Sequence, residues 1–376
     1  MHSVSEDSAD LIVIGGGLLG TALAWGAARQ QQRVLLLDEG DIAFRAARGN
    51  FGLVWVQGKG YGFSPYARWT VAASRLWPQL SEALREETGI DVHLQQTGGF
   101  HLCHGEQELQ ARHERLASIR ADLAGDYPYE FLSPAQARRE LPGLGPVVAG
   151  ASFCPLDGHA NPLKVLQALF QAGQQRGVRV RNGLRVTDIQ QAGGEFRLRT
   201  THGEMRAPRL VLAAGLGNRT LAPMVGLHAP VLPNRGHVLI TERTGYFLDR
   251  PTTHIRQTDE GTIQIGESME EVGLDDSLST DVLTRIAGRA ARSFPALAGL
   301  QLVRMWSALR VMSPDGYPIY AESPTCPGAY LVTCHSGVTL AAAHALRIAP
   351  WIAGAVEPEG IEAFSDRRFV AEETTT

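Results

Sequence analysis

The chain has 376 residues, of which 44% are apolar and 20% are charged, and its formal net charge is −4. A chain of this size and composition can fold into two globular domains, and its weak negative charge does not favour binding to nucleic acid or to an anionic membrane. The four cysteines are scattered without a CxxC pair, which favours a reducing compartment. The first ten residues are polar and no apolar run could span a bilayer, so we expect a cytoplasmic protein without a membrane span.

The N-terminal region predicts a strand–helix–strand unit. An apolar run begins at Asp10, apolar residues recur at helical spacing from Leu18 to Gln30, and a second apolar run covers Arg33 to Asp38. The turn between the first strand and the helix reads Gly15-Gly16-Gly17-Leu18-Leu19-Gly20, which is G-x-G-x-x-G. A strand before this motif and a helix after it are the context that a dinucleotide-binding turn requires.

Each glycine of the motif has a physical role in that interpretation. Gly15 permits the tight turn, Gly17 lets the main chain approach a pyrophosphate, and Gly20 lets the helix pack closely on the strand. The helix start at Leu18 and Leu19 offers backbone N–H groups and the positive end of the helix dipole to the phosphates.

Asp38 ends the second strand, where a carboxylate can accept hydrogen bonds from a ribose hydroxyl. Glu39 is the competing acid, and we rank it second because Asp38 lies closer to the expected strand end. The motif itself does not distinguish NAD(P) from FAD.

Later segments predict helices and strands in alternation. Helices are expected over 65–88, 106–123, 134–141, 161–177 and 280–293, with a closing helix in "VTLAAAHALRIAPWIAG". Strands are expected over 91–103, in "VRVRNGLRVTDI", "EFRLRTTHGEMRAPRLVLAAG" and "AYLVTCHSG", across most of 229–267 and over 301–311.

Three distant segments favour FAD, because an isoalloxazine ring needs more of the chain than a local fold. The strand "LVLAAG" ends at Ala214 and Gly215, which can flank the pyrophosphate, and Val186 lies on a strand whose backbone can meet the adenine. Gly337 precedes a helix start at Val338 and Thr339, which can stabilise negative charge on a reduced flavin near N1 and O2. Each segment taken singly can equally be an ordinary strand or cap, but their order supports FAD.

The segments "IVIGGGLLGTALAWGAA", "VLLLDEGD", "ARGNFG", "DGHANPLKVLQAL", "LVLAAG", "PVLPNRGHVLITE", "ALRVMSPDGYPIY" and "PGAYLVTCHSGVTLA" carry a family resemblance over nearly the whole chain. In this order they resemble the FAD-dependent D-amino-acid oxidase superfamily, which includes glycine and sarcosine oxidases. The segments "RGNFGLVWVQGKG", "DGHANPLK" and "CHSGVTLAAAHA" most resemble the FAD subunits of opine oxidases and hydroxyproline-type dehydrogenases.

The resemblance implies an α/β fold with two interleaved domains. A Rossmann-like FAD-binding domain of the glutathione-reductase type would use residues 1–80, 145–225 and 310–376. A smaller, mainly antiparallel substrate domain would use residues 81–144 and 226–309.

The resemblance also implies that the loop after the second strand runs beneath the flavin. Backbone N–H groups of Gly49, Asn50, Gly52 and Leu53 would meet the pyrophosphate, ribityl chain and ring, and Arg48 would add charge. Ala47 stands where many family members have a serine or threonine.

Two residues are candidates for the chemistry. The resemblance aligns Arg310 with the arginine that pairs with the substrate carboxylate in glycine oxidase, and guanidinium matches both carboxylate oxygens. The alternative for Arg310 is a structural ion pair with a neighbouring acid such as Asp315. His335 in "TCHSG" can orient the flavin or the substrate, or be an ordinary core histidine.

Further polar and aromatic residues have two interpretations each. Lys59 and Gln57 can face the isoalloxazine or cap the loop, Trp55 and Trp306 can wall the pocket or pack in the core, and His101 is expected to be structural. No His, Cys and Asp grouping has metal-ligand spacing, so no metal is expected. Sarcosine oxidases attach FAD to a cysteine before the segment matching "SPDG"; "RMWSALRVM" contains none, so we predict non-covalent FAD.

The predicted function is dehydrogenation of the C–N bond of a secondary or D-configured amino acid, such as an opine or hydroxyproline relative, by hydride transfer to flavin N5. The substrate is a small amino acid, and partner subunits that carry electrons onward are implied by the resemblance alone. The alternatives are an NAD(P)-dependent dehydrogenase and a non-catalytic FAD-binding subunit.

Overall fold

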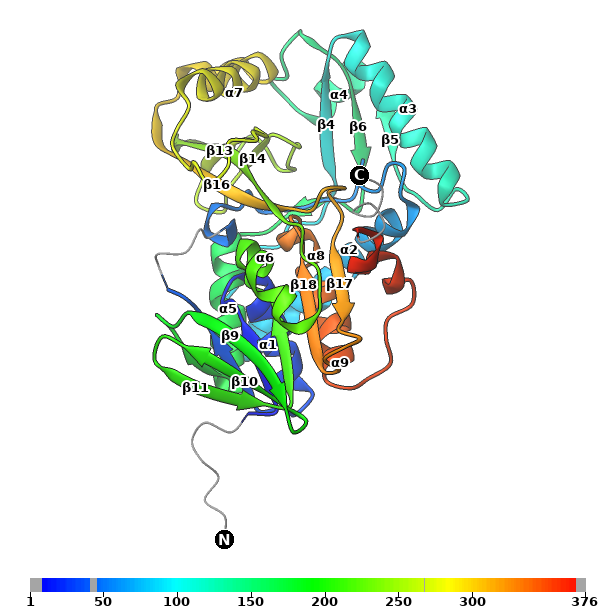
Figure 1. Cartoon of the computed structure of the whole chain (residues 1–376). Coiled ribbons are helices and arrows are strands. Elements are labelled where there is room, and N and C mark those ends of the chain that lie inside the picture. The colour runs from blue at the N-terminus through cyan, green and yellow to red at the C-terminus, as the bar shows by residue number, and fades with distance from the viewer. Residues whose placement is uncertain (1–8, 41–45, 267, 370–376) are drawn as a thin grey trace.

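The computed structural model describes residues 9–40, 46–266 and 268–369, and its centre is a six-stranded sheet. The strand order is β17-β18-β12-β1-β2-β8, and all neighbours are parallel except β17, which is antiparallel to β18. The strands are β1 (Leu11–Ile14), β2 (Val34–Leu37), β8 (Arg179–Arg181), β12 (Arg209–Leu212), β17 (Ile319–Glu322) and β18 (Ala329–Thr333). This sheet lies in the lower half of Figure 1.

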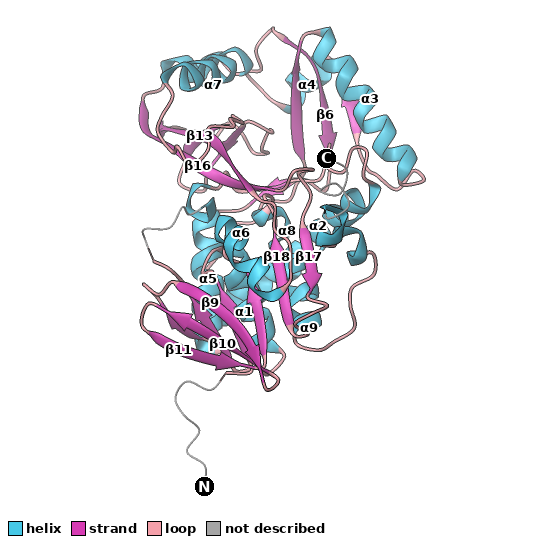
Figure 2. Cartoon of the chain, viewed as in Figure 1, coloured by secondary structure: helices cyan, strands magenta, loops and turns pink. Residues whose placement is uncertain are grey.

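Both faces of the six-stranded sheet are buried, which explains why β1 and β2 read as continuous apolar runs. One face packs Leu11 and Val13 against the helices α1 (Leu18–Arg29), α2 (Ser64–Thr88) and α8 (Gly337–Ala343). The opposite face packs Ile12 and Ile14 against a second, antiparallel sheet. Its strands are β9 (Val186–Ala192), β10 (Glu195–Thr200) and β11 (Gly203–Ala207), which Figure 2 shows at the lower left.

The upper half of the molecule holds two antiparallel sheets (Figure 1). The four-stranded sheet has the order β14-β15-β13-β16, and its strands are β13 (Leu232–Arg243), β14 (Ile255–Gln257), β15 (Thr262–Ile265) and β16 (Leu302–Met312). The three-stranded sheet has the order β4-β6-β5, with β4 (Gly99–His104), β5 (Glu130–Leu132) and β6 (Val148–Cys154). Helix α7 (Thr280–Ser293) shares one hydrophobic core with both sheets.

The remaining elements connect these layers. The pair β3 (Leu53–Val54) and β7 (Gly158–His159) forms a two-stranded ladder. The other helices are α3 (Glu106–Asp122), α4 (Pro134–Glu140), α5 (Pro162–Gln175), α6 (Asn218–Leu221) and α9 (Ala349–Ile352), and η5 (His344–Ile348) is a π-helical turn. Short 3₁₀ turns are η1 (Ala46–Gly49), η2 (Gly215–Gly217), η3 (Ala222–Val225), η4 (Pro295–Gly299), η6 (Ile361–Phe364) and η7 (Asp366–Phe369). In the described part of the chain no helix combines the length and apolar character needed to cross a bilayer.

The α/β fold class predicted from the sequence is confirmed, and one local prediction is wrong. The strand expected over 91–103 begins only at Gly99, because positive φ values at His93 (50°) and Gly98 (99°) turn the preceding chain out of any strand. The predicted closing helix is confirmed over residues 337–352, and it contains one π-helical turn, η5, before Pro350, which has no N–H to donate to the carbonyl one turn earlier.

Helix α1 lies very close to the closing helical segment. A Cβ on Gly26 would stand 2.3 Å from the carbonyl oxygen of Ala345 and 2.6 Å from Cβ of Ala349. The backbones can approach this closely only because position 26 has no side chain. The contact holds α1, and with it the glycine turn before it, against the chain that follows α8.

We predict that Gly26→Ala destabilises the protein by about 1–3 kcal/mol, because the added methyl group forces these two helical segments apart. The matched control is Gly288→Ala in α7, where the added Cβ would meet only the flexible end of Arg292 at 3.4 Å. Helix propensity makes that change neutral or stabilising by up to about 1 kcal/mol. Urea unfolding of both variants measures the difference, and equal stabilities would contradict the packing argument.

Candidate active site

The main chain of the glycine turn is accessible at Gly17 and closely packed at Gly20. A Cβ on Gly20 would stand 1.7 Å from the carbonyl oxygen of Gly15, so only glycine permits this contact of helix and turn. At Gly17, by contrast, a Cβ would meet only Cβ of Ala47, at 4.0 Å. Gly17 is the N-cap of α1, and no side chain caps the first turn of this helix. The first-turn N–H groups, at Leu18 and beyond, are therefore available to an anion such as a pyrophosphate.

Asp38 follows β2 directly and faces this turn. Its Oδ2 accepts a hydrogen bond from the backbone N–H of Gly16 at 2.7 Å, and its Oδ1 accepts one from Gly40 at 2.9 Å. Glu39 instead forms an ion pair with Arg185 at the surface. The structure thus places Asp38 against the glycine turn and Glu39 in a surface ion pair, and Asp38 as the ribose-binding acid stays a prediction.

Residues at the ends of other strands also lie near the glycine turn. A Cβ on Gly15 would stand 2.8 Å from Cα of Ala214, so the end of β12 lies directly against the turn. Gly215 follows with φ of 59°, which continues the chain away from the turn. Val186 begins β9 and packs in the same core as Leu37, the residue before Asp38. All of these positions lie around the predicted ADP half of the cofactor.

The segment from Ala46 to Leu53, called the flavin loop below, crosses from the nucleotide turn to the four-stranded sheet. A Cβ on Gly49 would stand 2.2 Å from Cβ of Ala308 on β16, so this contact requires a glycine. Asn50 accepts a hydrogen bond from the N–H of Gly52 at 2.8 Å, which forms a local turn. The side chain of Arg48 lies outside the described residues.

The start of α8 meets both the flavin loop and α1. The hydroxyl of Thr339 donates to the carbonyl of Leu53 at 3.3 Å. A Cβ on Gly337 would stand 3.1 Å from Cδ1 of Leu19, and the carbonyl of Val338 accepts from the indole of Trp77 at 3.1 Å. The predicted cofactor residues from remote parts of the chain therefore converge on one region. An open main chain at Gly17, an uncapped helix and a nearby carboxylate fit the ADP half of FAD, and the flavin loop fits its ring.

Arg310 lies on β16, which is paired with β13, and its partner in the register is Asn234. Its Nη1 donates to Oδ1 of Asn234 at 3.2 Å and to the carbonyl of Ser268 at 2.6 Å. A Cβ on Gly236 would stand 2.4 Å from Nη1, so the side chain lies directly over this glycine. Asp315, the acid we considered as a structural partner, is instead held by Arg368 at 2.7 Å.

His335 lies at the start of α8 in a positively charged environment. Its Nε2 is 3.1 Å from the hydroxyl oxygen of Ser336, which also accepts from Lys59 Nζ at 2.6 Å and from the Tyr66 hydroxyl at 2.9 Å. Burial, followed by the charges of Lys59 and Arg310, lowers the pKa of His335 to about 3. His335 is therefore neutral at physiological pH and can serve as a hydrogen-bonding group, but not as a cation.

Of the other candidate residues, Trp306 lies toward the flavin loop, and the rest are used in internal contacts. Trp306 shares the face of β16 that meets the flavin loop, whereas Trp55 is 6% exposed and packs in the interior. The amide of Gln57 is used internally, donating to the carbonyl of Gly99 at 2.9 Å and accepting from Arg112 at 2.7 Å. His101 is structural: burial holds its pKa well below the usual range, and its Nδ1 is 2.8 Å from the Thr253 hydroxyl.

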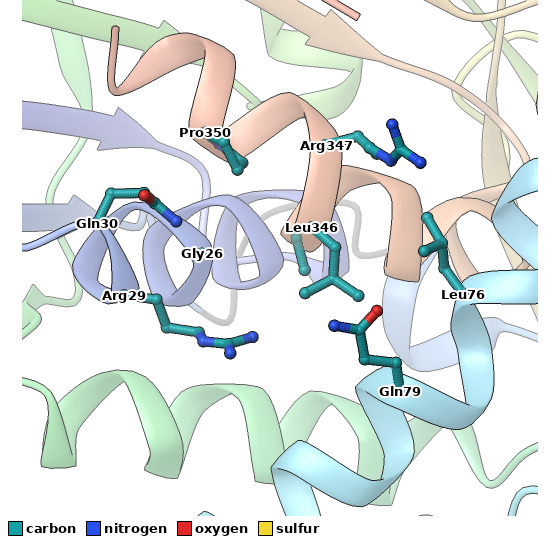
Figure 3. Close-up of a pocket in the computed structure, with 9 residues that line it drawn as sticks. Gly26, Arg29, Gln30, Leu76, Gln79, Leu346, Arg347 and Pro350 are labelled. Atoms are coloured by element: carbon teal, nitrogen blue, oxygen red, sulfur yellow. The ribbon is translucent and has the colours of Figure 1, made fainter. Parts of the chain in front are cut away.

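A pocket of about 340 Å³ lies away from this site, between α1, α2 and the η5 turn (Figure 3). It is lined by Gly26, Arg29, Gln30, Leu76, Gln79, Ala345, Leu346, Arg347 and Pro350. None of the predicted cofactor or substrate residues lines it. We therefore do not assign it to the reaction.

The fold and the converging loops define a dinucleotide-dependent oxidoreductase of the Rossmann type. Residues 10–351 match the DAO family, described as FAD dependent oxidoreductase, and the chain belongs to that family. It is therefore a flavoprotein enzyme that uses FAD, and the NAD(P) alternative is not supported.

Two relatives and one solved structure show the extent of the similarity. The chain is 43% identical over 365 residues to the B subunit of opine oxidase from Rhizobium meliloti, covering 97% of this chain and 98% of that protein. It is 44% identical over the same length, with the same coverage, to the B subunit of opine oxidase from Agrobacterium tumefaciens. The crystal structure of glycine oxidase from Geobacillus kaustophilus matches with a TM-score of 0.89 at 25% identity, covering 96% of this chain and 98% of that chain.

Sequence reasoning missed two buried charged residues beside the flavin loop. Asp157 is fully buried, and its Oδ1 accepts from the backbone N–H groups of Val56 and Gln57, just after the loop. Burial raises the pKa of Asp157 to about 7. Arg256 is 3% exposed on β14, next to Gly52. The stretch "HIRQ" around Arg256 has only one apolar residue, Ile255, so no sequence signal distinguished this buried arginine from an exposed one.

We predict that Asp38→Ala weakens FAD binding by about 10- to 100-fold, the value of one hydrogen bond to a charged group. The matched control is Glu39→Gln, which removes only an exposed ion pair with Arg185 and should leave FAD affinity within about twofold. Fluorescence titration of the two apoproteins with FAD gives the dissociation constants. A larger loss in Glu39→Gln than in Asp38→Ala would reverse the assignment of the ribose-binding acid.

We also predict that the protein loses stability as the pH falls below about 6.5. Burial lowers the pKa of His159, His335 and His344 to about 3 each, that of His104 to about 4 and that of His101 well below its usual range, so the unfolded chain binds at least five protons that the native state does not. Asp157, with its pKa raised to about 7, acts in the opposite direction by binding one proton in the native state. The net effect is destabilisation by acid between about pH 6.5 and 4.

Thermal unfolding of the protein measured from pH 8 to pH 5 tests this balance. The midpoint should be nearly constant above pH 7 and fall progressively below pH 6.5. His344→Gln removes one of these buried histidines and should make the fall less steep. A midpoint that stays flat down to pH 5 would contradict the proton count.

Proposed function

We propose that this enzyme dehydrogenates the C–N bond of a secondary or D-configured amino acid of the opine type. The observation that carries the proposal is the position of Arg310, whose guanidinium lies over Gly236 on the sheet face that meets the flavin loop. The high identity to two proteins named as components of opine oxidases supports the substrate class.

In the proposed mechanism, Arg310 binds the substrate carboxylate through its planar fork and so fixes the orientation of Cα. Lys59 and Arg310 make the site cationic, which lowers the pKa of a bound amine and favours its neutral form, the form that can be oxidised. Neutral His335 can orient the substrate without adding charge. When bound, FAD supplies the two-electron acceptor for the hydrogen that leaves Cα, and no dedicated acid or base is required.

The assembly and the domain division are part of the same proposal. Both opine oxidase relatives are named as one subunit of a larger enzyme, which supports a partner subunit that receives the electrons. We retain the division into an FAD-binding domain (1–80, 145–225, 310–376) and a substrate domain (81–144, 226–309) as a proposal. We also retain non-covalent attachment of FAD.

We predict that Arg310→Ala weakens substrate binding by about 30- to 1,000-fold, because a desolvated carboxylate loses its charged partner, worth about 2–4 kcal/mol. Arg304→Ala is the matched control: it lies on the same strand and the same face but is exposed, so its effect should be within about threefold. Anaerobic mixing with N-substituted, D- and L-amino acids, followed by flavin bleaching, measures binding and reduction together.

Three outcomes of this experiment are informative. Bleaching that depends on Arg310 supports the proposal, and bleaching that is unchanged in Arg310→Ala removes Arg310 from the site. A flavin that no amine bleaches would support the non-catalytic alternative. Reoxidation of the reduced enzyme by air should be slow compared with reoxidation by an artificial acceptor if electrons pass to a partner subunit.

A further inference from the structure

A serine stands at the N-terminal end of α8 and does not cap this helix. Ser336 occupies the N-cap position, and its carbonyl accepts the first intrahelical hydrogen bond, from Leu340 at 3.0 Å. A serine in this position usually accepts a hydrogen bond from an N–H group of the first turn, which stabilises the helix. The side chain of Ser336 makes no such bond. The first turn of α8 is therefore uncapped although a capping residue is present.

The hydroxyl of Ser336 is occupied by three other side chains. Nζ of Lys59 donates to Oγ at 2.6 Å, and the hydroxyl of Tyr66 donates to it at 2.9 Å. These two donors use both lone pairs of the oxygen, and its own proton is directed to Nε2 of His335 at 3.1 Å. An N–H group of the helix would find no free lone pair. Lys59 and Tyr66 therefore hold the serine in a state in which it cannot cap α8.

The two donors are themselves fixed in position. Tyr66 is 3% exposed and belongs to α2. Lys59 follows Gly58, whose N–H donates to the Tyr127 hydroxyl at 2.8 Å and whose carbonyl accepts from Arg115 at 3.0 and 2.9 Å. Gly58 has φ of 83°, which glycine adopts without strain. The turn that carries the ammonium group is thus held by its backbone on both sides.

The N-terminus of α8 is the start of a long helix and meets a second helix start. The segments α8, η5 and α9 form one helical run over residues 337–352, because the junctions at His344 (φ −59°, ψ −46°) and Ala349 (φ −61°, ψ −42°) stay helical. A Cβ on Gly337 would stand 3.1 Å from Cδ1 of Leu19, in the first turn of α1. No side chain caps α1 either. The positive ends of two helix dipoles at one place favour a negatively charged ligand.

Cationic side chains add to the positive potential of this region. Burial is the main reason why the pKa of His335 is lowered to about 3, and the charges of Lys59 and Arg310 lower it further. Burial raises the pKa of the Cys334 thiol to about 12, and Lys59 opposes this rise. The charged groups that act on these two side chains are therefore cations. Bound FAD supplies the negative charge that such a region attracts, from its phosphates and from its ring in the reduced state.

We propose that Lys59 and Tyr66 are positioning residues that keep Ser336 from capping the closing helix, so that the N–H groups at its start remain available to the negative charge of bound FAD. The two residues act through the serine and do not have to touch the cofactor. The inference rests on the predicted position of the flavin at the start of α8. It goes beyond the proposed function, because it holds for any amine substrate.

The test begins with Tyr66→Phe, which removes one donor and frees a lone pair of Ser336 for the helix. We expect this variant to bind FAD about 3- to 10-fold more weakly, measured by fluorescence titration of the apoprotein. The midpoint potential of the bound flavin should fall by about 15–30 mV. This shift corresponds to a preference for the reduced, negatively charged form that is about 3- to 10-fold weaker in a two-electron couple.

Ser336→Ala provides the decisive comparison, because alanine cannot cap the helix. Alone, this substitution should leave the FAD affinity within about twofold of the wild-type value. In Tyr66→Phe/Ser336→Ala, both the affinity and the midpoint potential should return to the wild-type values, within about twofold or about 9 mV. Lys59→Met should resemble Tyr66→Phe, but Ser336→Ala should restore it only in part, because the charge of Lys59 is also lost.

The rescue separates the proposal from a merely structural role of the two donors. A double variant that binds FAD no better than Tyr66→Phe overturns the inference, and so do an unchanged affinity and potential in Tyr66→Phe. A loss in Ser336→Ala equal to that in Tyr66→Phe also overturns it, because the hydroxyl itself would then bind FAD. If Tyr66→Phe does not fold, Lys59→Met with and without Ser336→Ala decides in the same way. A failure of the proposed function is distinct: no amine bleaches the flavin, while the effects on FAD binding persist.

Discussion

The close contact of Gly49 with Ala308 is the constraint on which the rest of the site depends. It brings the flavin loop within van der Waals reach of the four-stranded sheet, while the same loop faces Gly17 through Ala47 at the other end. The glycine turn and the four-stranded sheet are thereby fixed relative to each other by one short segment. Because a Cβ on Gly49 would stand 2.2 Å from Ala308, any larger residue would separate the two halves of the site.

Local sequence signals were sufficient for the nucleotide-binding half. The turn Gly15–Gly20, the strands on either side of it and Asp38 lie within one short stretch, so periodicity and glycine spacing determine the structure there. The converging positions at Ala214 and Gly337 were predicted only through their order along the chain and the family resemblance. No local pattern predicts that the end of β12 lies against Gly15, because that contact is produced by the pairing of β1 with β12.

The substrate half was harder to predict because its key relations are non-local. Arg256 and Arg310 share a face only through the pairing of β14, β15, β13 and β16, and no spacing in the sequence contains that register. The strand predicted over 91–103 failed for a related reason: alternation was present, but the positive φ of His93 and Gly98 is a backbone property that alternation does not report. The irregular chain places Gln95 beside His159, which in turn positions Arg256.

The electrostatics of the site follow from this arrangement. Burial and the charges of Lys59 and Arg310 lower the pKa of His335, so the histidine stays neutral and the positive charge is carried by the ammonium and guanidinium groups. His159 is kept neutral in the same way beside Arg256, with its pKa lowered to about 3 by burial. A site built from such cations and neutral imidazoles attracts carboxylates and repels ammonium groups. In the proposed function, these charges bind the carboxylate of the amino-acid substrate and favour the neutral form of its nitrogen.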